Sequence, residues 1–420
     1  MIIYKTLSIL IYPFIAIYIF SRAFFGKESH LRIGERFGFA GVARPQGQII
    51  WIHAVSVGET NSALVLVDEL LKKYEKTSIL FTTTTLTSAK ILGDKIDRSY
   101  GNRVIHQFLP IDCYFAANGF LDFWRPQIAL FLESEIWPNL IHIARKKYAI
   151  TSILVNARMS EKSAARWRFA RLLGFNIFDY FTFIFAQTLN DKNRFAKLTN
   201  KEILLYGNLK SQAANLSFDE NELQNIKQEI GVRKFWLAAS THKGEEEKII
   251  ATHRILRKKY PDLLTILVPR HTVRSNEIKA LMTSINFSQR SERQKITDQT
   301  EIYFADTMGE LGLFYKLADF AFIAGSFVEV GGHNPYEAIK LDCAVISGIH
   351  TYNFKEIYEK LFATNSCKIV KNENELSKII DEFLSDKNLW RTQLQNAKIA
   401  IKEDDAVAQR IVEKLDKFLK

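Results

Sequence analysis

Glu59 lies where a carboxylate can act as a general base. The apolar run from Trp51 to Val55 predicts a strand, a turn follows at Ser56–Gly58, and Glu59 then falls in the first turn of a helix. Such a carboxylate can accept a substrate proton if substrate binding desolvates it enough to raise its pKa against the helix dipole. The alternative is a surface glutamate that only stabilises the dipole, and the segment alone leaves both interpretations open.

Two further carboxylates and a lysine also follow strand-like runs. Glu133 and Glu135 close the apolar run that begins at Leu130, and strand alternation sends them to opposite faces unless the backbone turns first. Carboxylates at a strand end are seldom core residues, although caps and salt-bridge partners remain an alternative. Lys210 follows a later run and can reach a phosphate or a developing negative charge, or it is an ordinary solvated lysine.

The segment from Phe322 to Glu337 has the composition of a strand, an anion-accepting loop and a helix start. Its loop glycines permit positive φ and close backbone approach, Asn334 can cap the helix, and Pro335 suits the first helical position. Glu337 in the first turn can accept hydrogen bonds from ribose hydroxyls. An ordinary tight turn without a ligand is the alternative, with Glu337 complementing the helix dipole.

Three more segments in the second half follow predicted strands and precede helices, at 239–245, 268–271 and 307–310. They bring hydroxyls, Arg270 and helix-start N–H groups to one sheet edge, where a phosphate can bind. His242, His271 and His333 have no tight ligand spacing, so phosphate contact is favoured over zinc, with satisfied structural histidines as the alternative.

These segments need a scaffold of parallel strands. Apolar, β-rich runs alternate with helix-like segments almost from end to end, which predicts parallel sheets covered by helices. We expect strands at 49–53, 78–83, 104–108, 127–132, 152–155, 181–186, 203–206, 235–239, 263–268, 302–304, 320–324, 344–347 and 368–370.

This alternation of strands and helices predicts an α/β chain with two Rossmann-like, doubly wound domains that face a cleft. The segment 211–232 is polar and helix-prone without a strand, and marks the boundary. We therefore expect a membrane-associating segment at 1–22, an acceptor domain at 23–210, an interdomain segment at 211–232 and a donor domain at 233–420.

Several nucleotide-binding fingerprints are missing from the sequence. There is no G-x-G-x-x-G after a strand, no G-x-x-x-x-G-K-[ST], and no Asp-x-Asp pair for a metal-bound sugar nucleotide. Dehydrogenases, P-loop NTPases and metal-dependent transferases are therefore disfavoured. What remains is a nucleotide held by backbone and loops, so we expect no metal and no cofactor.

Charge and the N-terminus indicate a membrane. The 57 Lys+Arg and 46 Asp+Glu give a net charge of +11, yet no nucleic-acid-binding signature accompanies it. No charged residue occurs from Thr6 to Ser21, and basic residues follow, so the segment predicts a signal anchor or interfacial helix with the remaining chain cytoplasmic. The alternative is an apolar helix buried on the first domain. Three scattered cysteines fit a reducing compartment.

Taken together, the sequence resembles the 3-deoxy-D-manno-oct-2-ulosonic acid (Kdo) transferases of Gram-negative bacteria, which attach Kdo to the lipid A precursor. The similarity covers nearly the whole chain. It is carried, besides the N-terminal apolar run, by Gly34-Glu-Arg-Phe-Gly38, Ser56-Val-Gly-Glu59, Glu133-Ser-Glu-Ile-Trp-Pro-Asn139, Asn156-Ala-Arg158, Pro269-Arg-His271, Asp306-Thr-Met-Gly-Glu310 and Gly331-Gly-His-Asn-Pro335.

The resemblance implies an inverting, metal-independent glycosyltransferase of the GT-B architecture at the bacterial inner membrane, with its catalytic domains on the cytoplasmic side. Its substrates would be CMP-Kdo and the lipid A precursor lipid IVA, next to an anionic membrane surface. Glu59 would accept the proton, and Glu133 and Lys210 would stabilise the transition state. The implied contacts to CMP are Pro269, Arg270, Met308, Gly309, Glu310, Asn334, Pro335, Tyr336 and Glu337.

The sequence departs from the family pattern at two places. Ser211-Gln212 follows Lys210 where an aromatic residue and Asp are expected, and Thr272-Val273 follows His271 where Pro-Glu is usual. Two other functions stay open: a GT-B transferase that uses a UDP-sugar on another lipid, and a non-catalytic basic protein that binds nucleic acid or anionic lipid.

Overall fold

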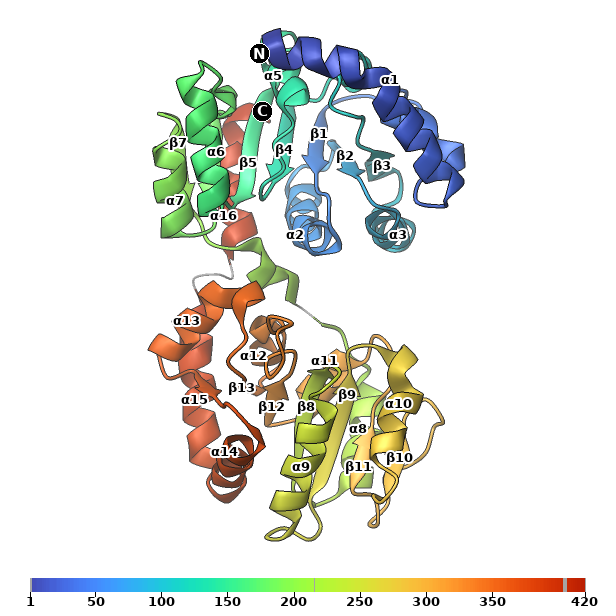
Figure 1. Ribbon diagram of the computed structural model, residues 1–420, viewed down its shortest axis with the longest axis vertical. Helices are drawn as coiled ribbons and strands as arrows, with labels where there is room; N and C mark the ends of the chain where they lie inside the picture. The colour runs from blue at the N-terminus through green and yellow to red at the C-terminus, as the bar shows by residue number, and fades with distance from the viewer. Residues whose placement is uncertain (1, 215, 403–405, 420) are drawn as a thin grey trace. The chain divides into compact units, whose positions relative to one another are not determined.

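The computed structural model describes residues 2–214, 216–402 and 406–419. The chain divides into two compact units (Figure 1). The first comprises the described residues as far as Ala213 together with those from Ala406 onward, and the second runs from Ala214 to Lys402. Residues 1, 215, 403–405 and 420 lie outside the described residues. Each of them belongs to one of the predicted segments, so those parts of the prediction are left aside.

The first unit contains a seven-stranded sheet in the order β3-β2-β1-β4-β5-β6-β7, and every neighbouring pair is parallel. Its strands are β1 (Ile49–His53), β2 (Ser78–Thr83), β3 (Val104–Phe108), β4 (Ile128–Leu132), β5 (Thr151–Ala157), β6 (Phe183–Ala186) and β7 (Glu202–Leu205). Its α-helices are α1 (Ile2–Phe24), α2 (Val57–Lys73), α3 (Leu86–Lys95), α4 (Tyr114–Trp124), α5 (Pro138–Lys146), α6 (Glu161–Leu172), α7 (Leu189–Ala196) and α16 (Val407–Leu415). Short helical turns are η1 (His30–Phe37), η2 (Ile96–Tyr100), η3 (Gly101–Arg103), η4 (Ile177–Tyr180), η5 (Leu209–Ala214) and η9 (Asp416–Phe418).

Both faces of this sheet are buried. In β1, Ile50 and Ile52 pack into one hydrophobic cluster, whereas Ile49 and Trp51 pack into another on the opposite face. A strand covered on both sides needs apolar residues at every position, which explains the continuous apolar runs in the sequence. The carboxyl ends of the strands then lie at one edge of the sheet, where loops are free to carry polar groups.

The second unit repeats the architecture with the order β10-β11-β9-β8-β12-β13-β14, again parallel throughout. Its strands are β8 (Phe235–Thr241), β9 (Leu264–Pro269), β10 (Phe287–Gln289), β11 (Ile302–Phe304), β12 (Phe320–Ile323), β13 (Ala344–Ser347) and β14 (Cys367–Ile369). Its helices are α8 (Glu220–Ile230), α9 (Glu246–Arg257), α10 (Ser275–Leu281), α11 (Leu311–Leu317), α12 (Pro335–Lys340), α13 (Lys355–Ala363), α14 (Glu373–Ser385) and α15 (Lys387–Ile401), with short turns η6 (Thr272–Arg274) and η7 (Tyr352–Phe354). The predicted fold class is confirmed.

Two predicted domain limits are wrong. The segment 211–232 is not a separate connection, because α8 packs in the second unit with Leu223 and Ile226 in its core. The second domain does not continue through the C-terminal helix either, because α16 packs on α2 and places Val407 and Ile411 in the core of the first unit. An amphipathic helix carries the same pattern whichever sheet it covers, so the pattern did not distinguish the two units.

Candidate active site

Glu59 lies in the first turn of α2 and closes a capping box there. The Ser56 side chain caps the helix by accepting from the Glu59 N–H at 3.3 Å, and the carboxylate accepts from the Ser56 hydroxyl at 2.9 Å and the Val55 N–H at 2.8 Å. A carboxylate has about four lone-pair directions, so these two hydrogen bonds leave room for a substrate hydroxyl. The interpretations as cap and as base are therefore compatible.

The surroundings of Glu59 raise the pKa of its carboxyl. Burial raises the pKa of this carboxyl above its usual value, and the charges of Glu133 and Glu135 raise it further, while the hydrogen bonds from Val55 and Ser56 pull it down. A base with a raised pKa holds a transferred proton more firmly. Three carboxylates thus act on one another at the same end of the sheet.

Glu133 and Lys210 form an ion pair inside the first unit. The Lys210 Nζ lies 2.8 Å from the Glu133 Oε1, and Glu133 is only 8% exposed. Glu133 follows β4 with a φ of 50°, so the chain turns directly after the strand. This turn interrupts the strand alternation that would have sent Glu133 and Glu135 to opposite faces. The structure therefore brings two of the predicted catalytic residues into contact.

Asn156 holds the backbone that carries Lys210, a role that sequence reasoning missed. Asn156 is buried with a φ of 53°, and its Oδ1 accepts from the Leu209 N–H at 3.0 Å. The Lys210 N–H in turn donates to the Asn208 Oδ1 at 3.0 Å. The Asn156-Ala-Arg158 motif was the available signal, but its partner lies 53 residues further along the chain.

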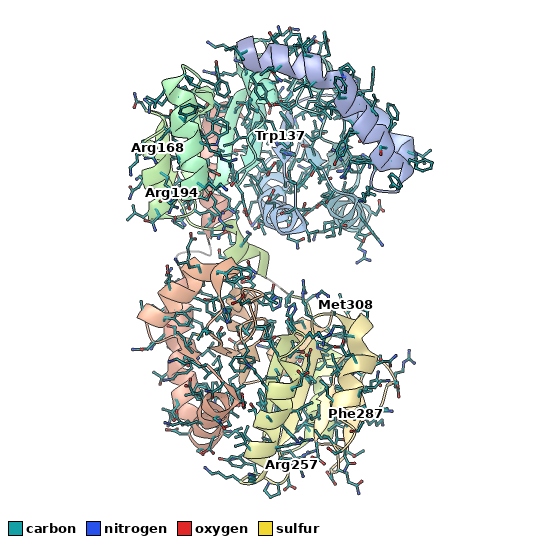
Figure 2. All side chains as sticks on the ribbon, in the orientation of Figure 1. Trp137, Arg168, Arg194, Arg257, Phe287 and Met308 are labelled. Atoms are coloured by element: carbon teal, nitrogen blue, oxygen red, sulfur yellow. The ribbon has the colours of Figure 1, made fainter. Side chains whose placement is uncertain are left out.

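Glu135 points toward the buried end of β1. It accepts from the Trp137 indole N–H at 3.0 Å, and its Oε2 lies 3.6 Å from the His53 Nε2. Trp137 precedes Pro138, the first residue of α5, and it lies within the first unit (Figure 2). Glu133 and Glu135 therefore face different partners after the turn, a lysine and an indole.

In the second unit, Asn334 and Pro335 start α12 as predicted. Asn334 is the N-cap, and its Oδ1 accepts from the Tyr336 N–H at 3.1 Å, while Pro335 occupies the first turn. The Tyr336 side chain is buried, so a ligand at the helix start would meet its backbone rather than its ring. The loop before the helix requires Gly325, because φ there is 69° and a Cβ would lie 3.0 Å from the His333 ring.

Among the predicted CMP contacts in the second unit, Glu337 has the carboxyl whose pKa is shifted most. Burial raises its pKa to about 7, against the opposing charge of Arg270 and a hydrogen bond from Asn334. Pro269 ends β9, and Arg270 follows it with an exposed side chain. Near neutral pH, the Glu337 carboxyl can thus change its ionisation when a polar ligand approaches.

If CMP contacts Glu337, this raised pKa should make its binding dependent on pH. If ribose hydroxyls donate to the ionised carboxylate, only that form binds well, and with a pKa of about 7 the affinity falls about tenfold between about pH 8 and pH 6. The Glu337→Gln variant should not show this tenfold fall in affinity. The remaining pH dependence of its CMP affinity should come from the titration of CMP itself. Calorimetric titrations of both proteins with CMP would measure it, and parallel pH profiles would exclude Glu337 as a ribose contact.

Met308, Gly309 and Glu310 lead into α11. Met308, which is labelled in Figure 2, is 71% exposed by its accessible surface, and Gly309 has a φ of 85°. The Glu310 carboxylate is already bound by the Arg290 guanidinium, at 2.6 Å and 3.1 Å, and by the Thr307 hydroxyl. A nucleotide at this turn would therefore meet the Met308 side chain and backbone groups more readily than the Glu310 carboxylate.

Glu245 organises the glycine loop and was not predicted as a site residue. It is fully buried, and its carboxylate accepts from the backbone N–H groups of Gly325, Ser326 and Phe327 at 2.6, 3.0 and 2.9 Å. The His242 N–H donates to the same carboxylate at 3.0 Å. Glu245 thus joins the loop after β8 to the loop after β12.

Glu245→Gln should destabilise the second unit. The amide keeps one acceptor oxygen, so about two of the four N–H groups lose their partner, at a cost of roughly 2–4 kcal/mol. Donor affinity should fall with it because the loop loosens. Chemical denaturation of the full chain would show this, with the exposed Glu247→Gln as the matched control; equal stability of the two variants would contradict it.

Two of the three histidines singled out above are in direct contact. The Nε2 atoms of His242 and His333 lie 2.8 Å apart, and the His271 ring stands edge-on to His242. Burial, followed by neighbouring groups that include Arg270, lowers the pKa of His242 to about 4 and that of His333 to about 3. Among the described residues, no group of three or more His, Cys, Asp or Glu is arranged to hold a metal ion.

Of the two departures from the family pattern, the one at Ser211-Gln212 makes structural hydrogen bonds. The Ser211 hydroxyl donates to the Asn208 carbonyl at 2.7 Å, and the Gln212 Oε1 accepts from the Ala408 N–H at 2.6 Å, which joins η5 to the start of α16. Thr272 and Val273 lie in the turn η6, where Val273 is 93% exposed.

Comparison with known proteins gives matches along the whole chain. A family model described as 3-Deoxy-D-manno-octulosonic-acid transferase (kdotransferase) matches residues 31–213, and one described as Glycosyl transferases group 1 matches residues 232–400. The 3-deoxy-D-manno-octulosonic acid transferase of Haemophilus influenzae is 34% identical, over 99% of this chain and 98% of the relative. The protein of the same name from Rickettsia bellii is 33% identical, over 94% and 93%.

Solved structures support the architecture. The UDP-GlcNAc 2-epimerase from Neisseria meningitidis superposes with a TM-score of 0.60 and covers 88% of this chain and 100% of its own. Its sequence identity is 13%, so this likeness concerns the fold alone.

Proposed function

The chain belongs to the 3-deoxy-D-manno-octulosonic acid (Kdo) transferase family, and from this premise we propose that it moves Kdo from CMP-Kdo to a lipid A precursor with inversion at the anomeric carbon. The observation that carries the proposal is the group of Glu59, Glu133 and Lys210 at the carboxyl end of one parallel sheet. It combines a carboxylate of raised pKa with an ion pair at 2.8 Å.

In the proposed reaction, a glucosamine hydroxyl of the lipid attacks the anomeric carbon of Kdo. The new C–O bond forms as the hydroxyl proton passes to the Glu59 carboxylate. The bond between the anomeric carbon and the phosphate oxygen breaks, and its electrons leave with CMP. Attack opposite the leaving group inverts the configuration, so one base and one leaving group suffice.

Lys210 and Glu133 act on the charge that develops during this step. A positive Nζ held by a buried carboxylate does not need to reorganise when negative charge builds up, which is how electrostatic stabilisation lowers a barrier. Glu133 fixes the position of the ammonium, and Asn156 fixes the backbone from which it projects. The proposed role of the pair is therefore transition-state stabilisation.

The second unit holds the donor in this proposal. Arg270 and the N–H groups at the start of α12 face the phosphate, and Glu337 receives the ribose hydroxyls. Pro269, Met308, Gly309 and the backbone at Glu310 complete the nucleotide contacts. The charge on the phosphate is met by protein groups, so the proposed route uses no metal. The raised pKa of Glu337 supports its assignment because perturbed carboxyls cluster at functional sites.

We place the enzyme at the bacterial inner membrane with both units on the cytoplasmic side. The 22-residue stretch Ile3–Phe24 is long and apolar enough to cross a membrane, with a mean hydropathy of 1.8. In its most apolar part, only 11% of the residues are buried. The net charge of +11 favours an anionic bilayer surface. The proposed acceptor, a lipid with acyl chains, would lie in the same membrane.

The donor and the stereochemistry test this function together. Purified protein should transfer Kdo from CMP-Kdo to tetraacylated lipid A precursor. The anomeric configuration of Kdo in the product, measured by NMR, should be opposite to that in CMP-Kdo. CMP should compete with CMP-Kdo, and UDP should not. A clear preference for UDP would favour a UDP-sugar transferase instead, and retained configuration would exclude direct displacement.

A further inference from the structure

The first half of α1 is hydrogen-bonded to the first unit. The Tyr4 hydroxyl donates to the Asp112 Oδ2 at 2.9 Å, and the Ser8 hydroxyl accepts from the Asn139 Nδ2 at 3.0 Å. Asp112 also accepts from the N–H groups of Asn139 and Leu140, at the start of α5. The beginning of α1 is therefore joined to the unit that carries Glu59.

The second half of α1 is held by aromatic packing. Tyr12 meets the ring of Phe37 edge-on with centroids 6.2 Å apart, and Phe20 stacks on the same ring at 5.6 Å. Tyr4 and Phe20 are 16 positions apart, which is about 24 Å along a helix. A helix that contacts one unit at two points about 24 Å apart must lie along its surface, as Figure 1 shows.

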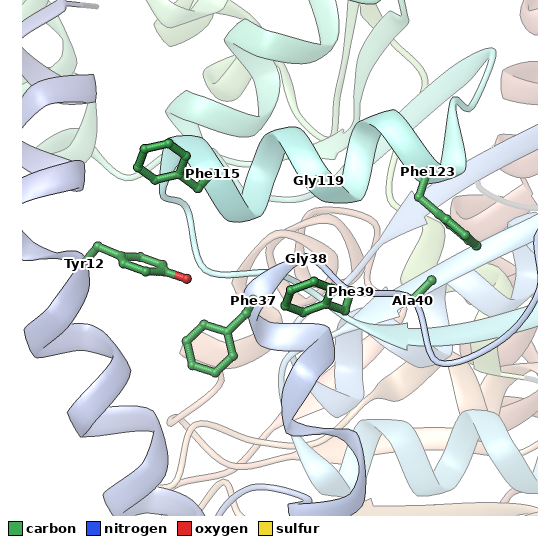
Figure 3. Close-up of a pocket in the computed structure, with 8 residues that line it drawn as sticks. All are labelled: Tyr12, Phe37, Gly38, Phe39, Ala40, Phe115, Gly119 and Phe123. Atoms are coloured by element: carbon green, nitrogen blue, oxygen red, sulfur yellow. The ribbon is translucent and has the colours of Figure 1, made fainter.

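An apolar pocket of about 320 Å³ lies where α1 meets η1 and α4 (Figure 3). Tyr12 approaches it from α1, and Phe37, Phe39, Phe115 and Phe123 line the rest, together with Gly38, Ala40 and Gly119. Phe39, Phe115 and Phe123 are also 71%, 59% and 40% exposed. The pocket is thus continuous with apolar surface on the unit itself, and α1 contributes Tyr12 to its lining.

The outward face of α1 is apolar as well. Leu7, Leu10, Phe14 and Ile17 recur at helical spacing and are 50%, 65%, 71% and 68% exposed. Soluble proteins rarely leave so large a contiguous apolar surface in water, and such surfaces mark membrane or protein contacts. No charged side chain occurs from Thr6 to Ser21, and a lipid bilayer suits that face better than the polar rim of a protein interface.

We propose that α1 lies in the plane of the membrane and docks the first unit onto it, rather than crossing the bilayer. One face of α1 packs on α4 and η1, and the other enters the lipid. A crossing helix would carry Tyr4 and Ser8 away from Asp112 and Asn139 and would withdraw Tyr12 from the pocket. The inference rests on the membrane association in the proposed function and adds the orientation of the helix.

Depth measurements at three positions of one helical face test this orientation. Leu7, Phe14 and Ser21 are spaced by seven residues and exposed, so each can be replaced by cysteine and spin-labelled in the full chain. The native Cys113, Cys343 and Cys367 are buried and should stay unlabelled. The proteins are bound to vesicles of phosphatidylethanolamine and phosphatidylglycerol, and label depth is read from collision with oxygen and a nickel chelate. Val232→Cys on the second unit gives the aqueous reference.

The in-plane helix predicts three nearly equal, shallow depths of about 5–10 Å below the headgroups. A crossing helix instead places the label at position 14 about 10 Å deeper than those at 7 and 21, which would overturn the proposal. If all three labels match the aqueous reference at position 232, the membrane association itself fails. Loss of the orientation and loss of the membrane role are therefore separate outcomes.

Discussion

Replacing Glu59 by glutamine is expected to lower kcat by roughly 10³- to 10⁴-fold, because an amide cannot take the acceptor proton as the carboxylate does. The amide still fits the capping box, since its oxygen can accept from the Val55 N–H as the carboxylate does at 2.8 Å. The loss of charge at the helix start should cost only about 0.5–1 kcal/mol of stability. Steady-state transfer assays with CMP-Kdo would measure the rate.

Affinity for CMP separates lost chemistry from lost structure in this variant. The proposed CMP contacts lie on the second unit, so CMP should bind the Glu59→Gln protein as it binds the wild type. The exposed Glu75→Gln, just after α2, is the matched control and should keep full activity. The acid limb of the wild-type kcat/KM profile should lie above the usual pKa range of glutamate, since burial raises the pKa of Glu59. Full activity of the glutamine variant would remove Glu59 as the base.

Lys210→Ala should lower kcat by about 10²- to 10³-fold, with a smaller change in the KM for CMP-Kdo, because it removes a fixed positive charge near the reacting atoms. It also leaves the Glu133 carboxylate without the ammonium at 2.8 Å, and Glu133 is only 8% exposed. The stability cost should be about 1–3 kcal/mol, since the Lys210 side chain is itself 27% exposed and the pair is partly screened. Rates and thermal unfolding would be measured on the same preparations.

A double-mutant cycle with Glu133→Gln tests whether the two residues act as one group. The double variant should be more stable than Lys210→Ala alone, because it no longer buries an unpaired charge. Its rate should stay as low as that of Lys210→Ala. The exposed Lys201→Ala is the matched control. If the rate losses of the two single variants simply multiply in the double variant, Glu133 and Lys210 act independently.

The strands were the most predictable part of the fold. Runs such as Ile49–His53 and Ala344–Ser347 are buried on both faces, so their apolar character is uninterrupted and their ends are sharp. The strand β10 (Phe287–Gln289) was missed because three residues at a sheet edge give too short a pattern. The C-terminal segment was placed in the wrong domain, since the apolar stripe of its helix does not identify the sheet on which it packs.

The candidate site was predictable where a motif carries the chemistry locally. Glu59 next to its cap and Asn334-Pro335 before a helix are local signals of this kind. Glu245 and Asn156 were missed because their partners lie 80 and 53 positions away and are backbone N–H groups, which any residue supplies. The contact of Glu133 with Lys210 depends on the positive φ of Glu133, a conformation that sequence alone rarely indicates for glutamate.

The most direct test of the account is mass spectrometry of the lipid made by the purified full-length chain from CMP-Kdo and tetraacylated lipid A precursor. The account predicts a lipid heavier by one or more whole Kdo residues, CMP released in equal number, and no such product from the Glu59→Gln variant. An unchanged lipid from wild-type protein that binds both substrates, or an equally modified lipid from the glutamine variant, would contradict it.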